Sequence, residues 1–361
     1  MKIVIFCGGP GNRFWPLGRR KNPKQFLKVL GRESLLQQRY SLVSKFFNKQ
    51  DIFISTGLEY RELIVKQLPK LPSENIILEP ERRDTAAAVG LSAAFLNKRF
   101  PEEPMSILWQ DHLVKNPEVF GRALKEAECL VKFGAPFVFI AVPAKSPNTH
   151  RGYIKAGKTI EKITKEVTHK EFSGFVEKPN LEQAKLYLED GSYYWNPGYF
   201  IALPKAILQM FKQHSPQMYE GLIKIEKSLG TAKEKRVLER EFKKFEKNSI
   251  DYLVLNKLSR EEATVLVCDM GWFDVGELDS LKEALQESRE NVVKRGLTID
   301  FESSDLLLYN GEKNKLLAAV GVSDLAIVNT NDVILVCHKE KVALIKKLLE
   351  KMKSEKLEHY L

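Results

Sequence analysis

Apolar runs and helical spacings alternate along the first 140 residues of the chain. Short runs rich in Ile, Val and Phe fit buried strands, and the segments between them place apolar side chains three or four positions apart, as helices do. The predicted strands are 2–7, 51–55, 75–78, 105–109 and 137–141, and the predicted helices are 34–43, 59–68, 84–99 and 117–133. Ser34 and Gln37 have the spacing of a capping box at the start of the first helix, and Asp84 or Thr85 could cap the third. This alternation predicts βαβ units, and hence an α/β fold with a Rossmann-like mixed, mostly parallel sheet flanked by helices.

Beyond residue 140 the pattern is less regular, and it changes character near residue 291. Further strands are predicted at 152–154, 172–176 and 199–202, and further helices at 181–188, 204–212 and 216–258. After residue 291, apolar runs recur at intervals of roughly eight to ten residues, which predicts a small all-β unit followed by an amphipathic helix at 340–353. We therefore divide the chain into a large domain at 1–288 and a small β domain at 289–361.

The charge balance narrows the class of partner. The chain has 57 Lys and Arg residues against 47 Asp and Glu residues, a net charge of +10, which suits an anionic partner. Because the basic residues are scattered among acidic ones, a nucleotide is favoured over a nucleic acid, and no stretch is long enough for a membrane span. The four cysteines lie far apart, which predicts buried thiols in a reducing cytoplasm rather than disulfides or zinc ligands.

Three glycines follow the first predicted strand. Gly8, Gly9 and Gly11 could let backbone N–H groups turn toward a phosphate, and Arg13 and Lys24 add cations nearby in the sequence. The segment lacks the Lys-Ser/Thr of the P-loop and the third glycine of the dinucleotide fingerprint. A strand turn with a surface arginine is the plainer interpretation of a lone glycine cluster, whereas the added cations suggest a polyphosphate site.

Two aspartates suit a metal ion. Asp111 follows the predicted strand 105–109, and Asp274 lies between two glycines far away in the sequence. Mg²⁺ takes oxygen ligands, commonly one or two carboxylates together with substrate phosphates. Each aspartate alone is more often a turn or cap residue, and His112 is better explained by structural hydrogen bonds than by metal binding.

Two further segments carry groups suited to a sugar phosphate. Glu177 could accept hydrogen bonds from sugar hydroxyls and Lys178 could bind a phosphate, although an exposed strand end stopped by Pro179 would have the same sequence. Asn196 lies in a turn among aromatic residues, which suits a sugar but also fits a buried aromatic turn.

Taken together these segments resemble the mannose-1-phosphate guanylyltransferase family of sugar-nucleotide pyrophosphorylases. The resemblance runs from Lys2 to about Leu285 and rests on six ordered blocks, namely 8–26, 79–86, 152–154, 175–179, 195–200 and 272–276. The C-terminal β unit also resembles the short left-handed β-helix of that family. The resemblance implies an enzyme that makes GDP-mannose and pyrophosphate from GTP and mannose 1-phosphate, with Mg²⁺ as its cofactor, and that forms a homodimer.

The resemblance also implies a role for each candidate residue. The residues that would stabilise charge and contact phosphates in catalysis are Arg13, Lys24 and Lys178, and those that would bind the nucleotide are Gly8, Gly9, Gly11, Arg83, Asp84 and Thr85. The residues that would bind the hexose are Gly152, Glu177 and Asn196, and those that would bind Mg²⁺ are Asp111 and Asp274. The same chemistry on another nucleotide or hexose 1-phosphate, a non-catalytic sugar-nucleotide sensor, and a nucleic-acid-binding protein are the alternatives. The sensor is disfavoured because it would not need two cations and two acids at the phosphates.

Overall fold

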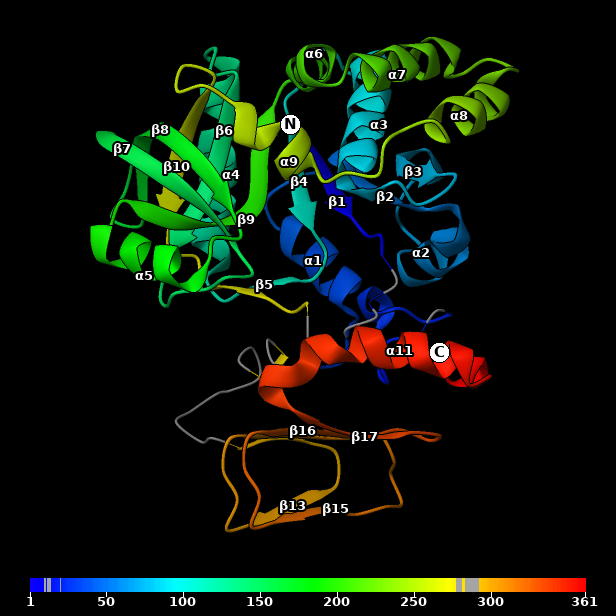
Figure 1. Cartoon of the computed structure of the whole chain (residues 1–361). Helices are drawn as coiled ribbons and strands as arrows, with labels where there is room; N and C mark the ends of the chain where they lie inside the picture. Colours follow the sequence, from blue (N-terminus) through cyan, green and yellow to red (C-terminus); the bar gives the residue numbers. More distant parts are fainter. Residues whose placement is uncertain (10, 12–13, 20, 277–280, 283–291) are drawn as a thin grey trace. The chain divides into compact units, whose positions relative to one another are not determined.

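A computed structural model of the chain describes residues 1–9, 11, 14–19, 21–276, 281–282 and 292–361 (Figure 1). The contacts group the chain into two compact units. The first unit contains Met1–Gly8, Tyr40–Gln110 and Val114–Trp272. The second unit contains Gly9–Arg39, Asp111–Leu113 and Phe273–Leu361.

The first unit is built on a nine-stranded mixed sheet with the order β3-β2-β1-β4-β9-β6-β10-β8-β7. Strands β3, β2, β1 and β4 are mutually parallel, β9 runs antiparallel to both β4 and β6, and β8 runs antiparallel to β10 and β7. The strands are β1 (Lys2–Phe6), β2 (Ile52–Gly57), β3 (Ile76–Glu79), β4 (Met105–Trp109), β6 (Phe137–Pro143), β7 (Gly152–Lys162), β8 (Val167–Glu177), β9 (Tyr193–Ala202) and β10 (Ala263–Cys268). The predicted α/β fold with a mixed sheet is confirmed.

Helices flank this sheet, and the core lies between the two layers. The helices are α2 (Arg61–Gln67), α3 (Asp84–Arg99), α4 (Pro117–Lys132), α5 (Leu181–Asp190), α6 (Pro204–His214), α7 (Pro216–Ser228), α8 (Glu234–Phe242) and α9 (Ile250–Leu253). Figure 1 shows α6, α7 and α8 gathered beside α3, and the buried alanines of α3 allow this close packing. Gly90 on α3 is an example, since a Cβ there would lie 2.8 Å from Leu222 of α7.

Some elements differ from those predicted. The segment 216–258, predicted as one helix, forms three helices, α7, α8 and α9. The first of them ends just before Gly230, which has a positive φ of 78°. Strands β7 and β8 extend well beyond the predicted segments because they form a long antiparallel ribbon, in which residues 158–162 of β7 are exposed. Strand β10 is a central strand that the pattern analysis did not identify.

The helix ends differ in how well the sequence predicted them. The capping box predicted at Ser34 is confirmed, since its Oγ accepts from Gln37 N at 3.1 Å and its N–H donates to Gln37 Oε1 at 3.0 Å, at the start of α1 (Leu35–Val43). In contrast, neither Asp84 nor Thr85 caps α3, because the helix already includes both and its N-cap position is Arg83.

The second unit contains the C-terminal β domain. Strands β12, β14, β16 and β17 form one sheet, and β13 pairs with β15 in another. Because the chain passes alternately between the two sheets and its strands pair in parallel register from β12 to β16, it coils as a β-helix does. The strands are β12 (Val292–Arg295), β13 (Thr298–Phe301), β14 (Leu306–Asn310), β15 (Leu317–Val320), β16 (Leu325–Asn329) and β17 (Ile334–His338), and α11 (Ile345–Ser354) follows.

A buried amide ladder stabilises successive turns of this domain. Asn329 Nδ2 donates to Asn310 Oδ1 at 2.8 Å, and Asn310 Nδ2 donates to the carbonyl oxygens of Leu297 and Lys315. Paired amides of this kind satisfy polar groups that burial would otherwise leave unpaired.

Two simpler expectations can be compared directly with the structure. Among the described residues there is no helix with both the length and the apolar character that a membrane span requires. All four cysteines are free thiols, but the prediction that all are buried is wrong, because Cys129 on the outer face of α4 is exposed.

Candidate active site

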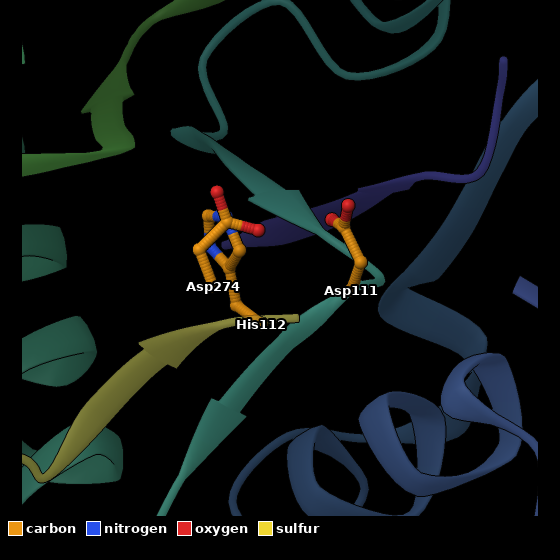
Figure 2. Close-up of side chains that lie close together, drawn as sticks. All are labelled: Asp111, His112 and Asp274. Atoms are coloured by element: carbon orange, nitrogen blue, oxygen red, sulfur yellow. The ribbon is translucent and has the colours of Figure 1, made fainter. Parts of the chain in front are cut away.

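Asp111, His112 and Asp274 come together in the second unit. One potential ligand atom from each side chain lies within 4.8 Å of the other two (Figure 2). Asp111 and His112 stand at the start of β5 (His112–Val114), and Asp274 ends β11 (Trp272–Asp274). The backbone fixes the two acids relative to one another, because Val275 N donates to the Asp111 carbonyl oxygen at 2.8 Å. His112 therefore belongs to the same cluster as the two acids, which the sequence analysis did not expect.

Lys24 gives this cluster its charge balance. Its ammonium forms a salt bridge with Asp111 Oδ2, and both side chains are largely shielded from solvent. Burial by itself would raise the pKa of Asp111, but the Lys24 ammonium and then His112 hold that pKa well below its usual range. Asp111 is consequently an anion over the whole physiological pH range, as a metal ligand must be.

The glycine loop lies next to Lys24 in the second unit. Gly9 and Gly11 have φ values of 91° and 63°, a region of backbone conformation that residues other than glycine rarely adopt. A Cβ at Gly11 would lie 3.0 Å from Lys24 Cγ, and Gln25 Nε2 donates to the Gly9 carbonyl oxygen at 3.2 Å. The loop and Lys24 are therefore packed against each other, while the predicted phosphate residue Arg13 lies outside the described residues. Gly8 belongs to the first unit, at the end of β1.

The three predicted hexose residues form one row across the sheet of the first unit. Gly152 on β7 is directly opposite Glu177 on β8 and Asn196 on β9. Gly152 is required between them, because a Cβ there would lie 2.5 Å from Glu177 Oε2 and 3.5 Å from Asn196 Cβ. In this row a glycine lies between a carboxylate and an amide. A carboxylate accepts hydrogen bonds from sugar hydroxyls, and an amide can both donate and accept them.

Lys178 stands at the end of this row. Its Nζ lies 2.7 Å from Glu177 Oε1, and its backbone has a positive φ of 49°, which is uncommon for a side chain of this size. Burial would lower the pKa of Lys178, but the hydrogen bond and charge of Glu177 raise it. Such strained backbone persists where the surrounding structure holds it in place, and functional sites are common among those places.

Asp251 is a further acid that the sequence analysis did not identify. It lies in the first turn of α9, and burial followed by the charge of Glu177 raises its pKa to about 7. Lys178 and Asp84 also act on it electrostatically, so it belongs with the row rather than with the solvent-exposed acids. The signal available in the sequence was the cap residue Ser249, whose Oγ accepts from Tyr252 N at 3.3 Å.

The predicted nucleotide residues of the 83–85 segment lie at the start of α3. Asp84 has a positive φ of 66°, and its Oδ1 accepts from Thr85 N at 2.7 Å. Thr85 Oγ1 accepts from Ile250 N at 2.9 Å, which ties the start of α3 to the start of α9. The Arg83 guanidinium forms an ion pair with Glu81 at 2.6 Å, so this side chain already has an anionic partner.

The predicted site residues thus fall into two groups. The second unit brings together Gly9, Gly11, Lys24, Asp111 and Asp274, and the first unit brings together Gly152, Glu177, Lys178 and Asn196. The group in the second unit offers two carboxylates and a cation, which suit a metal ion and phosphates. The group in the first unit offers hydrogen-bonding groups and a cation, which suit a phosphorylated sugar.

Comparison with known proteins gives concordant matches over the whole chain. The family described as nucleotidyl transferase matches residues 2–291, and the MannoseP isomerase/GMP-like beta-helix domain matches residues 296–352. The alginate biosynthesis protein AlgA of Pseudomonas syringae pv. tomato is 34% identical over 350 residues, which cover 96% of this chain and 70% of that protein. The mannose-1-phosphate guanylyltransferase of Escherichia coli K12 is 32% identical over 360 residues, which cover 98% of this chain and 73% of that protein.

A solved structure extends this similarity to the backbone. The crystal structure described as mannose-1-phosphate geranyltransferase from Thermus thermophilus matches with a TM-score of 0.85 at 26% identity. The match covers 98% of this chain and 99% of that one, so it includes the C-terminal β domain.

Proposed function

We propose that this chain, an enzyme that belongs to the mannose-1-phosphate guanylyltransferase family of nucleotidyl transferases, converts GTP and mannose 1-phosphate into GDP-mannose and pyrophosphate. The observation that carries the proposal is the meeting of Lys24, Asp111 and Asp274, three residues from distant segments, beside the glycine loop. An acid pair with an adjacent cation is what a reaction between two phosphate anions requires.

The reaction needs alignment and charge neutralisation more than proton transfer. An oxygen of the sugar phosphate attacks the α-phosphorus of GTP, a new P–O bond forms, and the bond from the α-phosphorus to the bridging oxygen breaks as pyrophosphate leaves. The attacking oxygen is already anionic, so no general base is required. We assign the triphosphate to the backbone of Gly8, Gly9 and Gly11 and to the cations Arg13 and Lys24.

The hexose 1-phosphate is assigned to the row in the first unit. Glu177 would accept hydrogen bonds from sugar hydroxyls, Asn196 would donate and accept, and Lys178 would pair with the phosphate. Asn196 Oδ1 already accepts from Gly198 N at 2.8 Å, which orients the amide and leaves its NH₂ group pointing away from that turn. Arg83, Asp84 and Thr85 are assigned to the ribose or base.

Mg²⁺ is the proposed cofactor, and the residues present fit it. Asp111 and Asp274 offer hard carboxylate oxygens, and the low pKa of Asp111 keeps that ligand ionised. When bound, Mg²⁺ supplies charge neutralisation between the phosphates of the two substrates. His112 orients and supports the cluster, since imidazole is a poorer ligand for Mg²⁺ than a carboxylate.

We further propose that the enzyme works in the cytoplasm as a homodimer, with 1–288 carrying the chemistry and 289–361 the β domain. Ile299 and Phe301 on β13 and Val320 on β15 are exposed apolar residues, and Phe301 lies directly opposite Val320, which makes them candidates for the dimer interface. Light scattering after size-exclusion chromatography tests the dimer, and a monomer at micromolar concentration would overturn it.

The test of the function is a turnover screen of four nucleoside triphosphates against mannose, glucose and N-acetylglucosamine 1-phosphates. We expect GTP with mannose 1-phosphate to give the highest kcat/KM. If another pair of nucleoside triphosphate and hexose 1-phosphate gives a higher kcat/KM, the proposed substrates are wrong but the proposed type of reaction stands. Mg²⁺-dependent binding without pyrophosphate release would favour the sensor.

A further inference from the structure

The segment after the glycine loop has a structural role that the proposed chemistry does not explain. Phe14 is fully buried and Trp15 is 5% exposed, and both belong to one apolar cluster of the second unit. Their neighbours in that cluster include Ile345, Leu349 and Met352 of α11. The segment that continues the phosphate loop therefore packs on the C-terminal helix of the β domain.

Hydrogen bonds fasten the same segment to the C-terminal residues. Trp15 Nε1 donates to the Tyr360 carbonyl oxygen at 2.8 Å, and Arg19 Nη1 donates to the same oxygen. Arg19 Nη2 pairs with Asp332 Oδ1 at 2.7 Å, and Arg19 Nε donates to the Pro16 carbonyl oxygen at 2.7 Å. One guanidinium thus links three different parts of the second unit, a task for which its planar fork is well suited.

The fastened segment is continuous with the glycine loop and with Lys24. Phe14 N donates to the Gly11 carbonyl oxygen at 2.9 Å, and Gly18 packs beneath it, since a Cβ there would lie 3.3 Å from that oxygen. Arg19 and Asn22 exchange two backbone hydrogen bonds of 3.1 Å, which close the turn that leads to Lys24. A displacement at Arg19 would therefore be passed directly to Lys24 and Gly11.

The metal-binding acids depend on the same apolar cluster. Val275, which follows Asp274 and whose N–H bonds to Asp111, is fully buried in the cluster with Leu307, Val328 and Leu349. The residue that follows Asp274 and the residues that follow the glycine loop therefore share one apolar core with the β domain.

We propose that Trp15 and Arg19 are positioning residues of the phosphate site, and that they act by tethering the glycine loop and Lys24 to the β domain at Tyr360 and Asp332. This inference rests on the proposed function, because it assigns the loop to the triphosphate. The β domain then supports the phosphate site without contributing a catalytic residue, because catalytic groups must be held to within about 0.5 Å of their productive positions.

The test compares three variants with the wild-type chain of residues 1–361. Arg19→Met keeps the aliphatic stem and removes the hydrogen bonds to Tyr360, Asp332 and Pro16. Arg19→Lys keeps the charge but not the fork, and Trp15→Phe removes the indole N–H donor while keeping a smaller aromatic ring. Lys351→Met is the matched control, because it breaks an ion pair between α11 and its C-cap residue Glu355 that does not reach the loop. Each protein is measured for kcat, for both KM values, for equilibrium binding of Mg²⁺-GTP by calorimetry, and for its melting temperature.

We expect Arg19→Met to lower kcat and Mg²⁺-GTP affinity about tenfold or more, since misplacement of a substrate-positioning group is costly. The KM for the sugar phosphate should stay within about twofold, Arg19→Lys should restore part of the loss, and Lys351→Met should equal the wild type. A lower melting temperature with unchanged kcat and GTP affinity would show a purely structural tether and overturn the inference.

The measurements distinguish a failure of the proposed tether from a failure of the proposed function. If the wild type does not convert mannose 1-phosphate, the proposed substrate is wrong, while the ratio of GTP affinities between wild type and Arg19→Met still tests the tether. If the wild type turns over and Trp15→Phe and Arg19→Met both behave as the control, the tether alone is wrong.

Discussion

Gly152→Ala is the sharpest test of the hexose row, because the structure sets the size of the disturbance. The added Cβ would lie 2.5 Å from Glu177 Oε2, whereas ordinary contacts begin near 3.4 Å. The Glu177 carboxylate must therefore move by about 0.9 Å, the difference between these two distances. The same Cβ would also lie 3.2 Å from Phe175 Cζ, which limits the directions in which the carboxylate could move. The φ of Gly152 is not positive, so alanine introduces no backbone strain of that kind.

A movement of this size should damage sugar binding more than folding. Overpacking costs about 1–3 kcal/mol of stability, which a domain of this size can tolerate. The Glu177–Lys178 pair, 2.7 Å long in the wild type, would be disturbed at the place where the sugar phosphate is expected. Misplacement by about 1 Å can cost up to a hundredfold in rate, so we expect the KM for mannose 1-phosphate to rise tenfold to a hundredfold, with the KM for GTP nearly unchanged.

Steady-state kinetics with each substrate varied in turn provides the assay, and Gly157→Ala is the control. Gly157 lies on the same strand, and its added Cβ would lie 2.8 Å from Ser173 Oγ and 2.9 Å from Glu171 Oε2, so the substitution crowds β7 in a similar way but outside the row. Wild-type KM values in a folded Gly152→Ala enzyme would show that the row does not bind the sugar. Equal losses for both substrates would show a general distortion instead.

Two further predictions concern the acids. Asp111→Asn and Asp274→Asn should each lose most turnover and require more Mg²⁺, and a double-mutant cycle on kcat/KM should be strongly non-additive because the two side chains serve one ion; strictly additive losses with unchanged Mg²⁺ dependence would refute a shared ion. For Asp251, burial first and then Glu177 raise the pKa to about 7, so the folded chain holds this proton more tightly than the unfolded chain, whose pKa is about 4. The stability that this group contributes is full below about pH 4 and is lost as the pH rises through 7. Asp251→Asn should therefore melt at a higher temperature than wild type at pH 8, and this advantage should shrink steadily toward pH 4; an advantage independent of pH would contradict the titration.

The sequence predicted the elements of the central sheet well because they are buried on both faces. Apart from Lys2 and Ser106, strands β1 and β4 are apolar runs between clear turn signals, so their identity does not depend on their neighbours. The length of the β7 and β8 ribbon was underestimated because residues 158–162 of β7 are exposed and carry no apolar alternation, and because the added residues of β8 bury only Val167 and His169 before Phe172. Strand β10 was not predicted because it follows a strongly charged segment that was assigned to one long helix over 216–258. The interruption of that helix at Gly230 was missed as well.

The candidate site shows a similar limit. Gly152, Glu177 and Asn196 were each found in a separate segment, but their alignment in one row depends on strand register, which distant parts of the chain determine. Asp251 was missed because it lies on a helix of four residues whose partners, Glu177 and Thr85, are distant in sequence. His112 was underestimated for the same reason, since its relation to Asp274 appears only in three dimensions.

Pyrophosphate release measured for each nucleoside triphosphate with each hexose 1-phosphate, with and without Mg²⁺, tests the central claim most directly. We expect Mg²⁺-dependent release with the highest kcat/KM for GTP and mannose 1-phosphate, together with GDP-mannose in equal amount. No release from any pair, in a folded protein supplied with Mg²⁺, would contradict the claim.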